Sequence, residues 1–519
     1  MDSFGLKKRT SENKKQRLWT ALFSGGLLSY VFLFFVITVA YFLFKPLWEY
    51  SGIARATCSS LAVCGVLVIA FCLFWLHQGG RLTHRHLLLA LIATGVLFRI
   101  CYMLYTPFTW RGHDIGDYDS TGHFAYIYNL ILGDGLPKSY SYQFYHPPLM
   151  HLISAAFCKL CSLFTGAVEP FDLVDPAKVI SCLASVSILI TSVKIGTYFK
   201  LSQKAMLLLT AIMAFMPTFY ILAASINNDV LMIALYLAAF YRTLLWKDDP
   251  CFKNILMIAL CIGGSMMSKL SGGFIALFTA FVFLLVLAKG VQGVSVGSLQ
   301  KKLLTGLIGQ FAGFGLVCVP MGLWYPIRNL ILFGQPLMYV PRMSEKSELF
   351  CGDMTVWQRF FSFPVEEIVK SPYCHPFGDW NIWVYTLKCS VFGEFQFSDR
   401  PDVYSYGLLL FNFLLICFSV AAMVFVWIKR KDLSPWKRFA PGFIWISLMI
   451  SFIQFNLQYP FGCTMDYRYI VPTCFVGAYY LALAVYENKK KSKPNAFLGW
   501  ATGIVTAGFC VFSTLFYFG

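Results

Sequence analysis

Residues 404–428 read YSYGLLLFNFLLICFSVAAMVFVWI, without one charged side chain. A helix of about 20 such residues crosses the roughly 30 Å of hydrocarbon in a bilayer. It can lie in lipid because its backbone hydrogen bonds are made within the helix itself. Lys429, Arg430 and Lys431 follow the run directly. The stretch therefore predicts a membrane-spanning helix that ends on a basic connection.

Similar apolar runs recur along the whole chain. They predict about thirteen membrane-spanning helices, near residues 21–44, 56–76, 87–105, 179–199, 205–222, 230–246, 255–267, 274–287, 303–323, 404–428, 439–455, 469–486 and 497–516. The composition agrees, because 58% of the 519 residues are hydrophobic, 13% are charged and the mean hydropathy is +0.64. A soluble protein of this length has a larger charged surface. We therefore expect an all-α, multi-pass integral membrane helical bundle.

The net charge of +17 comes mainly from basic residues in the short segments between the apolar runs. Such segments usually face the cytoplasm, so this charge predicts orientation and no nucleic acid partner. The clusters expected to face the cytoplasm are Lys7, Lys8, Arg9, Lys14, Lys15 and Arg17; Lys200 and Lys204; Arg242, Lys247 and Lys253; Lys289, Lys301 and Lys302; Lys429, Arg430, Lys431, Lys437 and Arg438; and Lys489, Lys490, Lys491 and Lys493. The N-terminus is then cytoplasmic and the C-terminus lies on the opposite, outer side. We expect the endoplasmic reticulum membrane if the source is eukaryotic and the plasma (inner) membrane if it is bacterial.

This alternation requires that Leu149–Phe164 does not cross the membrane. The stretch follows a Pro-Pro pair, carries His151 and Lys159, and is barely long enough to span. We expect it to be a helix lying in the membrane surface. A second surface helix is expected at about 123–132, ended by the turn that begins at Gly133 and contains Asp134.

A polar, acidic insert, Arg111–Leu149, follows the third apolar run. Its candidate functional residues are Asp114, Asp117, Asp119, His123 and His146. At the boundary of water and bilayer, a carboxylate in a partly dehydrated pocket can take a proton from an acceptor hydroxyl or amine. Asp117, Asp119 and His146 are also residue types that bind a divalent cation. Capping in an ordinary solvated loop is the alternative for each aspartate.

The same orientation places further polar motifs on the outer side. They are Asn227-Asn228-Asp229, Lys269, Trp324–Pro336 with Tyr325, Arg328 and Asn329, Glu394 in the long outer loop Trp324–Val403, and Asp466-Tyr467-Arg468-Tyr469. Motifs that lie far apart in the sequence but share one membrane face predict a single site. Lys269, Arg328 and Arg468 lie outside against the inward bias, which a lipid-linked phosphate would explain. The alternatives are that Arg328 and Arg468 extend to the interface without partners and that Asp229 and Lys269 form a structural ion pair.

The order of these motifs resembles the GT-C superfamily of glycosyltransferases, and most closely the group of protein O-mannosyltransferases and aminoarabinose transferases. The resemblance lies in the acidic first outer loop, His-Pro-Pro-Leu at 146–149, Lys-Leu-Ser-Gly at 269–272, Trp-Tyr-x-x-Arg-Asn-x-x-x-x-Gly-x-Pro at 324–336 and Arg-Tyr at 468–469. It covers about residues 87–486. Asp117-Tyr118-Asp119-Ser120 replaces the adjacent Asp-Glu pair of the family, so which aspartate is the base stays open.

The resemblance also suggests how the chain is organised. The expected parts are a basic cytoplasmic arm (1–20), two additional helices (21–86), a GT-C-like catalytic core (87–486) with its acidic outer loop (106–165) and long outer loop (324–403), and a basic loop with a last helix (487–519).

The resemblance implies an inverting glycosyltransferase of the hexosyl or mannosyl type. It would move a sugar from a polyprenyl (dolichyl or undecaprenyl) phosphate to an acceptor protein, lipid or glycan on the outer side. Asp114, Asp117 or Asp119 would act as the base, and basic residues would stabilise the departing lipid phosphate. Family members differ in their need for a metal, so a divalent cation stays open.

A membrane transporter or lipid flippase is the alternative function. Such proteins place charges along a path through the bilayer. The single outer face of the polar motifs and the lack of a visible internal repeat argue against it.

Four cysteines, Cys351, Cys374, Cys389 and Cys463, lie in the predicted outer loops. They can form a disulfide in an oxidising compartment. The sequence leaves the pairing open.

Overall fold

The computed structural model describes residues 26–45, 51–116, 122–292, 298–341, 343–487 and 493–519. Within these ranges the chain forms helices and their connections, apart from one isolated antiparallel bridge between Phe350 and Phe461. The described part of the chain is therefore all-α, as predicted.

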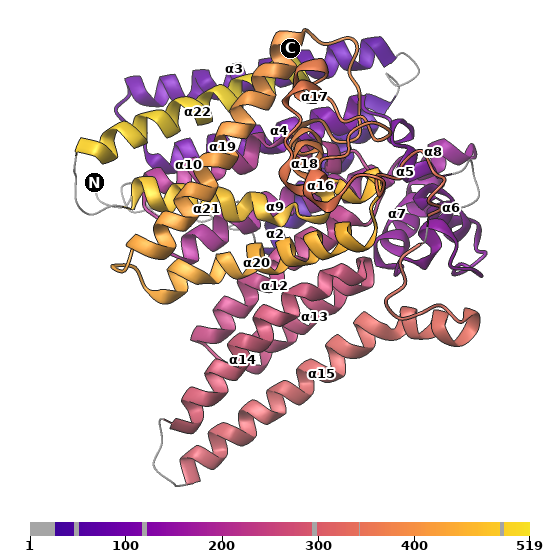
Figure 1. Ribbon diagram of the computed structural model, residues 1–519, viewed down its shortest axis with the longest axis vertical. Coiled ribbons are helices and arrows are strands. Elements are labelled where there is room, and N and C mark those ends of the chain that lie inside the picture. Colours follow the sequence, from indigo (N-terminus) through magenta and orange to yellow (C-terminus); the bar gives the residue numbers. More distant parts are fainter. Residues whose placement is uncertain (1–25, 46–50, 117–121, 293–297, 342, 488–492) are drawn as a thin grey trace, which may run out of the picture.

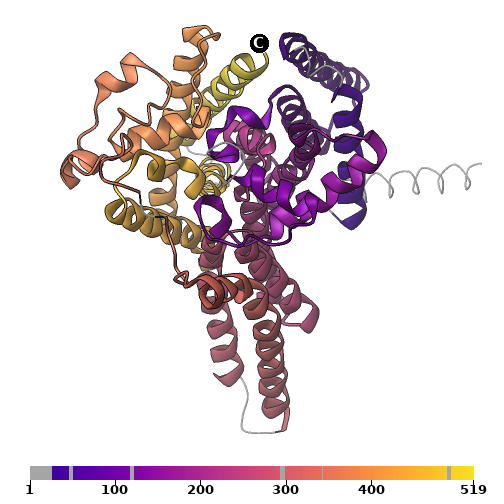
Figure 2. The ribbon, with the colours of Figure 1, turned by 90° about the vertical axis from the view of Figure 1, so that its right-hand side faces the viewer.

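Long helices run between the two ends of a bundle (Figure 1). They are α2 (Leu27–Phe44), α3 (Ser51–Gln78), α4 (His84–Tyr105), α9 (Ala177–Tyr198), α10 (Gln203–Phe215) continued by α11 (Pro217–Ala223), α12 (Asp229–Asp248), α13 (Phe252–Ser268), α14 (Ile275–Gln292), α15 (Ser298–Phe333), α19 (Asp402–Lys429), α20 (Pro435–Gln458), α21 (Pro472–Tyr486) and α22 (Lys493–Phe518). Of these, α14 and α15 project from the rest of the molecule (Figures 1 and 2).

Short helices connect the long ones at one end, which we call the insert end. They are η2 (Phe108–Trp110), α5 (Gly112–Ile115), α6 (His123–Leu132), η3 (Tyr142–Tyr145), α7 (Leu149–Thr165), α8 (Pro170–Val174), η4 (Leu270–Phe274), α16 (Val356–Phe361), α17 (Val365–Lys370), α18 (Ile382–Phe392), η5 (Gly462–Met465) and η6 (Tyr467–Tyr469).

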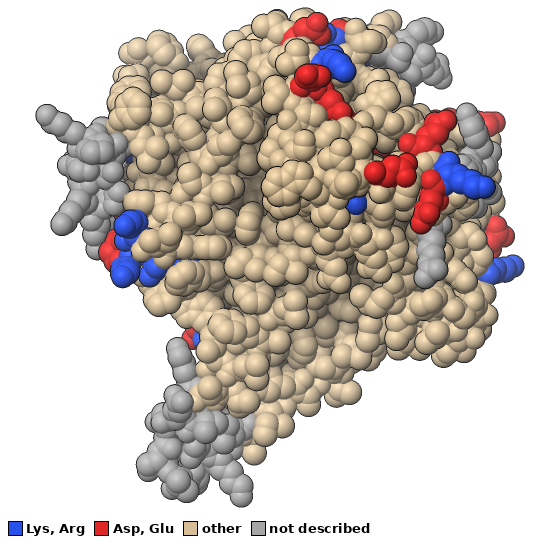
Figure 3. All heavy atoms as spheres, in the orientation of Figure 1, with Lys and Arg blue, Asp and Glu red and all other residues tan. Residues whose placement is uncertain are grey.

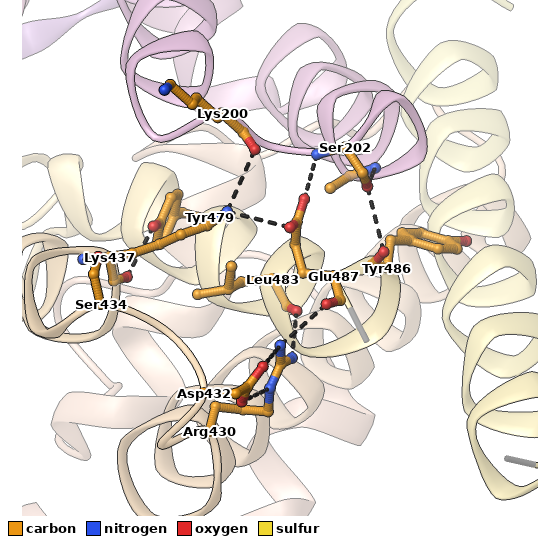
Figure 4. Close-up of polar contacts among 11 residues, drawn as sticks. Lys200, Ser202, Arg430, Asp432, Ser434, Lys437, Tyr479, Leu483, Tyr486 and Glu487 are labelled. Atoms are coloured by element: carbon orange, nitrogen blue, oxygen red, sulfur yellow. Dashed lines mark hydrogen bonds and ion pairs between the residues drawn. The ribbon is translucent and has the colours of Figure 1, made fainter. Parts of the chain in front are cut away.

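The opposite end, which we call the basic end, brings together the connections α9–α10 and α19–α20 with the end of α21 (Figure 4). The ammonium group of Lys437 donates to the carbonyl of Lys200 at 3.4 Å and pairs with the carboxylate of Glu487 at 3.2 Å. Arg430 pairs with Asp432 at 2.8 Å. Basic clusters from separate connections thus meet at one end, as predicted. The N-terminal cluster and Lys489 to Lys491 lie outside the described residues.

The surface between the two ends is apolar. Figure 3 shows the Lys, Arg, Asp and Glu side chains of one face in groups at its left, top and right, with broad uncharged surface between them. The exposed large side chains of α3 include Leu61, Val63, Leu67, Val68, Phe71, Phe74 and Trp75. A water-soluble monomer rarely exposes so large an apolar patch. The fold is that of a multi-pass helical membrane protein.

When helices are judged by length and composition alone, the structure has fewer membrane crossings than the sequence predicted. Ten described helices are long and apolar enough to cross a membrane, and the bent pair α10–α11 would make eleven. Each predicted span coincides with a long helix or with that pair. However, α13 and α21 are shorter apolar helices. α21 starts at Pro472 and not at Tyr469, because proline is favoured in the first turn of a helix and Tyr469 belongs to η6.

The two helices expected in the membrane surface are α6 and α7, which lie at the right of Figure 1. α6 spans His123–Leu132 as predicted, and Gly133 ends it with a φ of +91°, where glycine is favoured. Both ends of α7 connect to elements at the insert end, so α7 does not cross the bundle. It buries one face and exposes Leu160, Leu163 and Phe164. An exposed apolar face in this position supports the prediction that α7 lies in the bilayer surface.

A buried arginine stabilises a break in one span. The helices α10 and α11 are bent by 48° at Pro217, which lacks an N–H to donate to the preceding turn. Arg99 of α4 is fully buried and donates to the carbonyls of Met213 at 2.9 Å and Ala214 at 3.2 Å. Its Nε donates to the hydroxyl of Ser185 at 3.0 Å. Arg99 therefore satisfies backbone carbonyls that the break leaves without helical donors.

Arg99→Lys is expected to lower the free energy of unfolding by about 1–3 kcal/mol, because one ammonium group cannot replace the planar fork of donors and leaves a buried acceptor unsatisfied. Chemical unfolding of the purified protein in detergent measures the change. The control is Arg81→Lys, at an exposed position. Equal stability of the two variants would contradict this role of Arg99.

Candidate functional site

Asp114 is a predicted catalytic residue that lies in a buried polar site at the insert end. It is carried by α5 and its side chain is fully buried. The backbone N–H of Ile226, between α11 and α12, donates to Asp114 Oδ2 at 2.9 Å. Oδ1 has no hydrogen-bond partner among the described residues. One carboxylate oxygen is therefore held in place, and the other is left to accept a proton.

Arg111 links Asp114 to the long outer loop. Its Nε lies 3.9 Å from Asp114 Oδ1 and 3.5 Å from Glu394 Oε1. Gly393, with a φ of +64°, ends α18 and turns the chain so that Glu394 reaches the site. Arg111 is only 5% exposed, yet its Nε and Nη1 make no hydrogen bond within the described structure. The guanidinium group therefore lies between two carboxylates while keeping N–H groups for a ligand.

Arg468 lies at the same cavity. Its Nε is 3.5 Å from Asp466 Oδ2, and its backbone N–H donates to Asp466 Oδ1 at 2.8 Å. Arg468 is 8% exposed, and its Nε and Nη1 also lack hydrogen-bond partners in the described ranges. The cavity has a volume of about 20 Å³, enough for about one water molecule, and Arg111, Cys389 and Tyr467 are among its lining residues. Two buried guanidinium groups with unused donors are suited to bind an anion.

Asp229, which is fully buried, and Lys269, whose side chain is 12% exposed, form an ion pair at the head of α12. The Lys269 ammonium group also lies 4.9 Å from the centre of the Tyr469 ring. Beside the pair, Asn228 Nδ2 donates to the carbonyl of Ser268 at 2.7 Å. The two residues therefore form the structural ion pair that was the alternative to phosphate binding by Lys269. Because its charge is already paired, Lys269 is less suited to a phosphate than Arg111 or Arg468.

Four histidines pack together beside this cluster: the rings of His146 and His151 stack on His123, and His113 meets His123 edge-on. His123 Nδ1 lies 2.8 Å from His151 Nε2, and the nearly parallel rings of His123 and His146 have centres 5.7 Å apart. Burial lowers the pKa of His113, His123 and His146 well below its usual value, and nearby basic side chains lower it further. These imidazoles are therefore neutral at pH 7.

Gly122 allows this packing of histidines against Asp114. A Cβ at position 122 would lie 2.0 Å from the carbonyl oxygen of Ile115. Only glycine fits here, so the start of α6 approaches the end of α5 closely. The result places His123 of α6 next to His113 of α5, with ring centres 5.2 Å apart.

Tyr325, Arg328 and Asn329 form a separate polar group at the end of α15. Arg328 donates to the carbonyl of Pro137 at 3.1 Å and to Asn329 Oδ1 at 2.7 Å. The Tyr325 hydroxyl donates to the carbonyl of Phe144 at 2.7 Å. These contacts hold α15 to the insert. The predicted phosphate ligand Arg328 thus contacts neutral groups of the insert in the described structure.

The environment of Asp114 changes its acidity. Burial raises the pKa of Asp114 to about 6, although Arg111 and the N–H of Ile226 oppose the rise. The negative charge of Glu394 adds to it. A carboxylate with this pKa is ionised at pH 7 and is still basic enough to accept a proton.

Asp117 and Asp119 lie outside the described residues, so two candidate bases are not placed. Both were also candidate metal ligands. In the described ranges, no group of three or more His, Cys, Asp or Glu side chains is arranged to hold a metal ion. The third candidate ligand, His146, stacks on His123 and Tyr145. The divalent cation stays a prediction.

The sequence analysis missed Arg111 as a site residue and gave no role to Asp466, although it included Asp466 in a polar motif of the outer side. Arg111 is a basic residue on the predicted outer side, so the criterion applied to Lys269 and Arg468 would have found it. Asp466 precedes Arg468 by two residues in the same motif. Cys389 carries no such signal, because it lies in the short apolar helix α18.

Fold and site together define a multi-pass helical membrane protein with a buried, charged cluster at one end of its bundle. Searches of known protein families and of curated proteins found no match to this chain. The chemistry of the site residues is thus what bears on function.

Proposed function

We propose that this protein is an inverting glycosyltransferase that moves a sugar from a polyprenyl phosphate to an acceptor at the insert end. One juxtaposition supports the proposal above all. The buried carboxylate of Asp114 lies beside the guanidinium group of Arg111, and Arg111 and Arg468 line one small cavity. Both guanidinium groups keep N–H groups without hydrogen-bond partners among the described residues. A base next to an anion site is what sugar transfer from a phosphate requires.

In the proposed reaction, Asp114 takes a proton from the acceptor hydroxyl or amine. The acceptor atom attacks the anomeric carbon while the bond from that carbon to the phosphate oxygen breaks. Arg111 and Arg468 stabilise the negative charge of the departing polyprenyl phosphate. A single displacement of this kind inverts the anomeric configuration.

The donor class is a dolichyl or undecaprenyl phosphate that carries a hexose such as mannose, and the acceptor is a protein, lipid or glycan. In this proposal the basic end faces the cytoplasm and the insert end faces the lumen or the cell exterior. The membrane is the endoplasmic reticulum membrane in a eukaryote or the plasma membrane in a bacterium.

The test is sugar transfer by the purified protein in proteoliposomes, with radiolabelled dolichyl-phosphate mannose and undecaprenyl-phosphate hexoses as donors. Labelled sugar should appear on an acceptor while an equal amount of polyprenyl phosphate is released. The double variant Arg111→Met with Arg468→Met is the negative control. Movement of lipid across the bilayer without sugar transfer would instead support a transporter or flippase, which the broken span α10–α11 favours.

The pH dependence of the reaction should follow Asp114. We expect kcat/KM to rise with pH through about 6, where Asp114 loses its proton. Glu394→Gln removes a negative charge that raises the pKa of Asp114, so the rise should move to lower pH. Arg111→Met removes a positive charge that lowers this pKa, so the rise should move to higher pH. Initial rates over a pH series measure both shifts, and identical profiles in all three proteins would exclude Asp114 as the base.

A further inference from the structure

A second cavity lies at the basic end of the bundle, opposite the candidate site. It has a volume of about 330 Å³, within the roughly 300–1,000 Å³ typical of small-ligand sites. Its lining residues come from three helices: Lys247 and Asp248 at the end of α12, Leu285 and Val286 of α14, and Trp436 in the first turn of α20. The hydroxyl of Tyr198, the last residue of α9, donates to Asp248 Oδ2 at 2.6 Å. This contact places the cavity beside the α9–α10 connection.

Two opposite charges lie side by side among the described residues that line this cavity. The Lys247 ammonium group pairs with the Asp248 carboxylate and lies 5.0 Å from the centre of the Trp436 ring. The Lys247 side chain is 16% exposed and the Asp248 side chain is 54% exposed, so both can be reached from the surface. A ligand that carries a phosphate and an ammonium group complements the pair. Its phosphate pairs with Lys247, and its ammonium group pairs with Asp248 beside an indole ring that attracts cations.

An apolar stripe leads away from the cavity along α14. Leu277, Phe281 and Leu284 are exposed and lie three or four residues apart, so they share one face of the helix. Leu285, in the cavity wall, follows Phe281 by four residues. Phe281 also stacks on Phe443 of α20, with ring centres 6.1 Å apart. The stripe thus starts at the charged pair and continues along the side of α14 that meets α20, as the acyl chain of a lipid does below its head group.

We propose that the cavity and the stripe bind one zwitterionic glycerophospholipid, with its phosphate on Lys247, its ammonium group on Asp248 and an acyl chain on α14. Pockets between helices at the membrane surface that contain basic side chains are known to bind lipid head groups. An anionic phospholipid fits this cavity less well, because its head group has no cation to pair with the Asp248 carboxylate. None of these residues belongs to the candidate site, so the inference does not depend on sugar transfer.

The test is native mass spectrometry of the intact protein in detergent, titrated with dioleoyl phosphatidylethanolamine, phosphatidylcholine or phosphatidylglycerol. The first two lipids should bind about fivefold more tightly than phosphatidylglycerol, the effect of one partly exposed ion pair. Glycerophosphoethanolamine has the same head group without acyl chains and should not compete at equal concentration. Equal or tighter binding of phosphatidylglycerol would overturn the zwitterionic assignment. Effective competition by glycerophosphoethanolamine would overturn the role of the stripe.

Variants of the charged pair assign the binding to this cavity. Lys247→Met should weaken binding of phosphatidylethanolamine about tenfold, the effect of losing one charge-assisted hydrogen bond. Asp248→Asn should weaken it about threefold, since Asp248 is more exposed, and should remove the preference over phosphatidylglycerol. The matched controls are Lys253→Met and Asp249→Asn, at exposed positions of the same connection that do not line the cavity. Both controls should bind the three lipids as the unmodified protein does.

The unfolding temperature of each variant without added lipid shows whether it is folded. Because Asp248 is exposed, Asp248→Asn keeps the test valid even where Lys247→Met lowers stability. Unchanged affinity and unchanged lipid preference in Asp248→Asn would overturn the proposal, and so would equal losses in the variants and their controls. Both measurements detect bound lipid and not catalysis, so their outcome and that of the sugar-transfer assay are separate.

Discussion

Asp114→Asn is expected to lower the rate of sugar transfer by about 10²–10⁴-fold, the usual effect of losing a general base. The amide oxygen of asparagine can still accept the N–H of Ile226, so the local fold should be kept. The amide cannot take a proton from the acceptor at neutral pH. Single-turnover rates with labelled polyprenyl-phosphate sugar measure the loss, and an unchanged unfolding temperature shows that the variant is folded.

Asp134→Asn is the matched control, because Asp134 lies exposed in the turn after α6 of the same insert. This variant should transfer sugar at the full rate. Full turnover in Asp114→Asn, Asp117→Asn and Asp119→Asn, and in the triple variant, would refute the proposed function. Loss of turnover in Asp117→Asn or Asp119→Asn alone would assign the base to that residue and not to Asp114.

Lys269→Met is expected to lower the free energy of unfolding by about 3–5 kcal/mol, the cost of leaving one partner of a buried ion pair without the other. The affected partner is Asp229, which is fully buried and keeps one oxygen without a hydrogen bond among the described residues. Unfolding by denaturant in detergent micelles measures the change.

The double variant Asp229→Asn with Lys269→Met should recover much of that loss, since neither charge is then left unpaired. Lys138→Met, at an exposed position in the insert, is the control and should leave stability unchanged. A Lys269→Met protein of normal stability but with weak donor binding would contradict the structural role and favour direct contact with the phosphate.

Several local features could be predicted because they depend on a few neighbouring residues. The helix at His123–Leu132 and its end at Gly133 were predicted correctly, since a glycine with positive φ commonly ends a helix. α7 also begins and ends at the insert end, in agreement with the prediction from the basic clusters that this stretch does not cross the membrane. The polar outer motifs do gather at the insert end.

Helix ends inside the apolar runs were harder to predict. The predicted span 469–486 begins too early, because Tyr467–Tyr469 forms a 3-10 helix and α21 starts only at Pro472. The span 205–222 is two helices, because Pro217 interrupts it and Arg99 from α4 supplies donors to the break. Hydropathy is an average over many residues and does not register either event.

In the site, the residue types were predicted better than their partners. Asp114 and Glu394 both lie next to Arg111, which lines one cavity together with Arg468. Arg328, predicted to bind a lipid-linked phosphate, contacts the carbonyl of Pro137 in the described structure. Arg111 was recognised as a site residue only from its distances to Asp114 and Glu394 in the structure. A partner can be identified only when two distant segments are seen in contact.

The sequence by itself determined the class of the molecule: apolar runs of spanning length must be satisfied within helices, and charges at their ends set the alternation of those helices. Only the tertiary structure decided which partner each charged side chain has. Arg111 lies between Asp114 and Glu394, Lys269 forms an ion pair with Asp229, and Cys389 donates a hydrogen bond to Asp466. The reason is the separation along the chain over which each kind of interaction acts. Hydrophobic burial and backbone hydrogen bonding act along a local segment, whereas a buried charge finds its partner among side chains from distant parts of the chain.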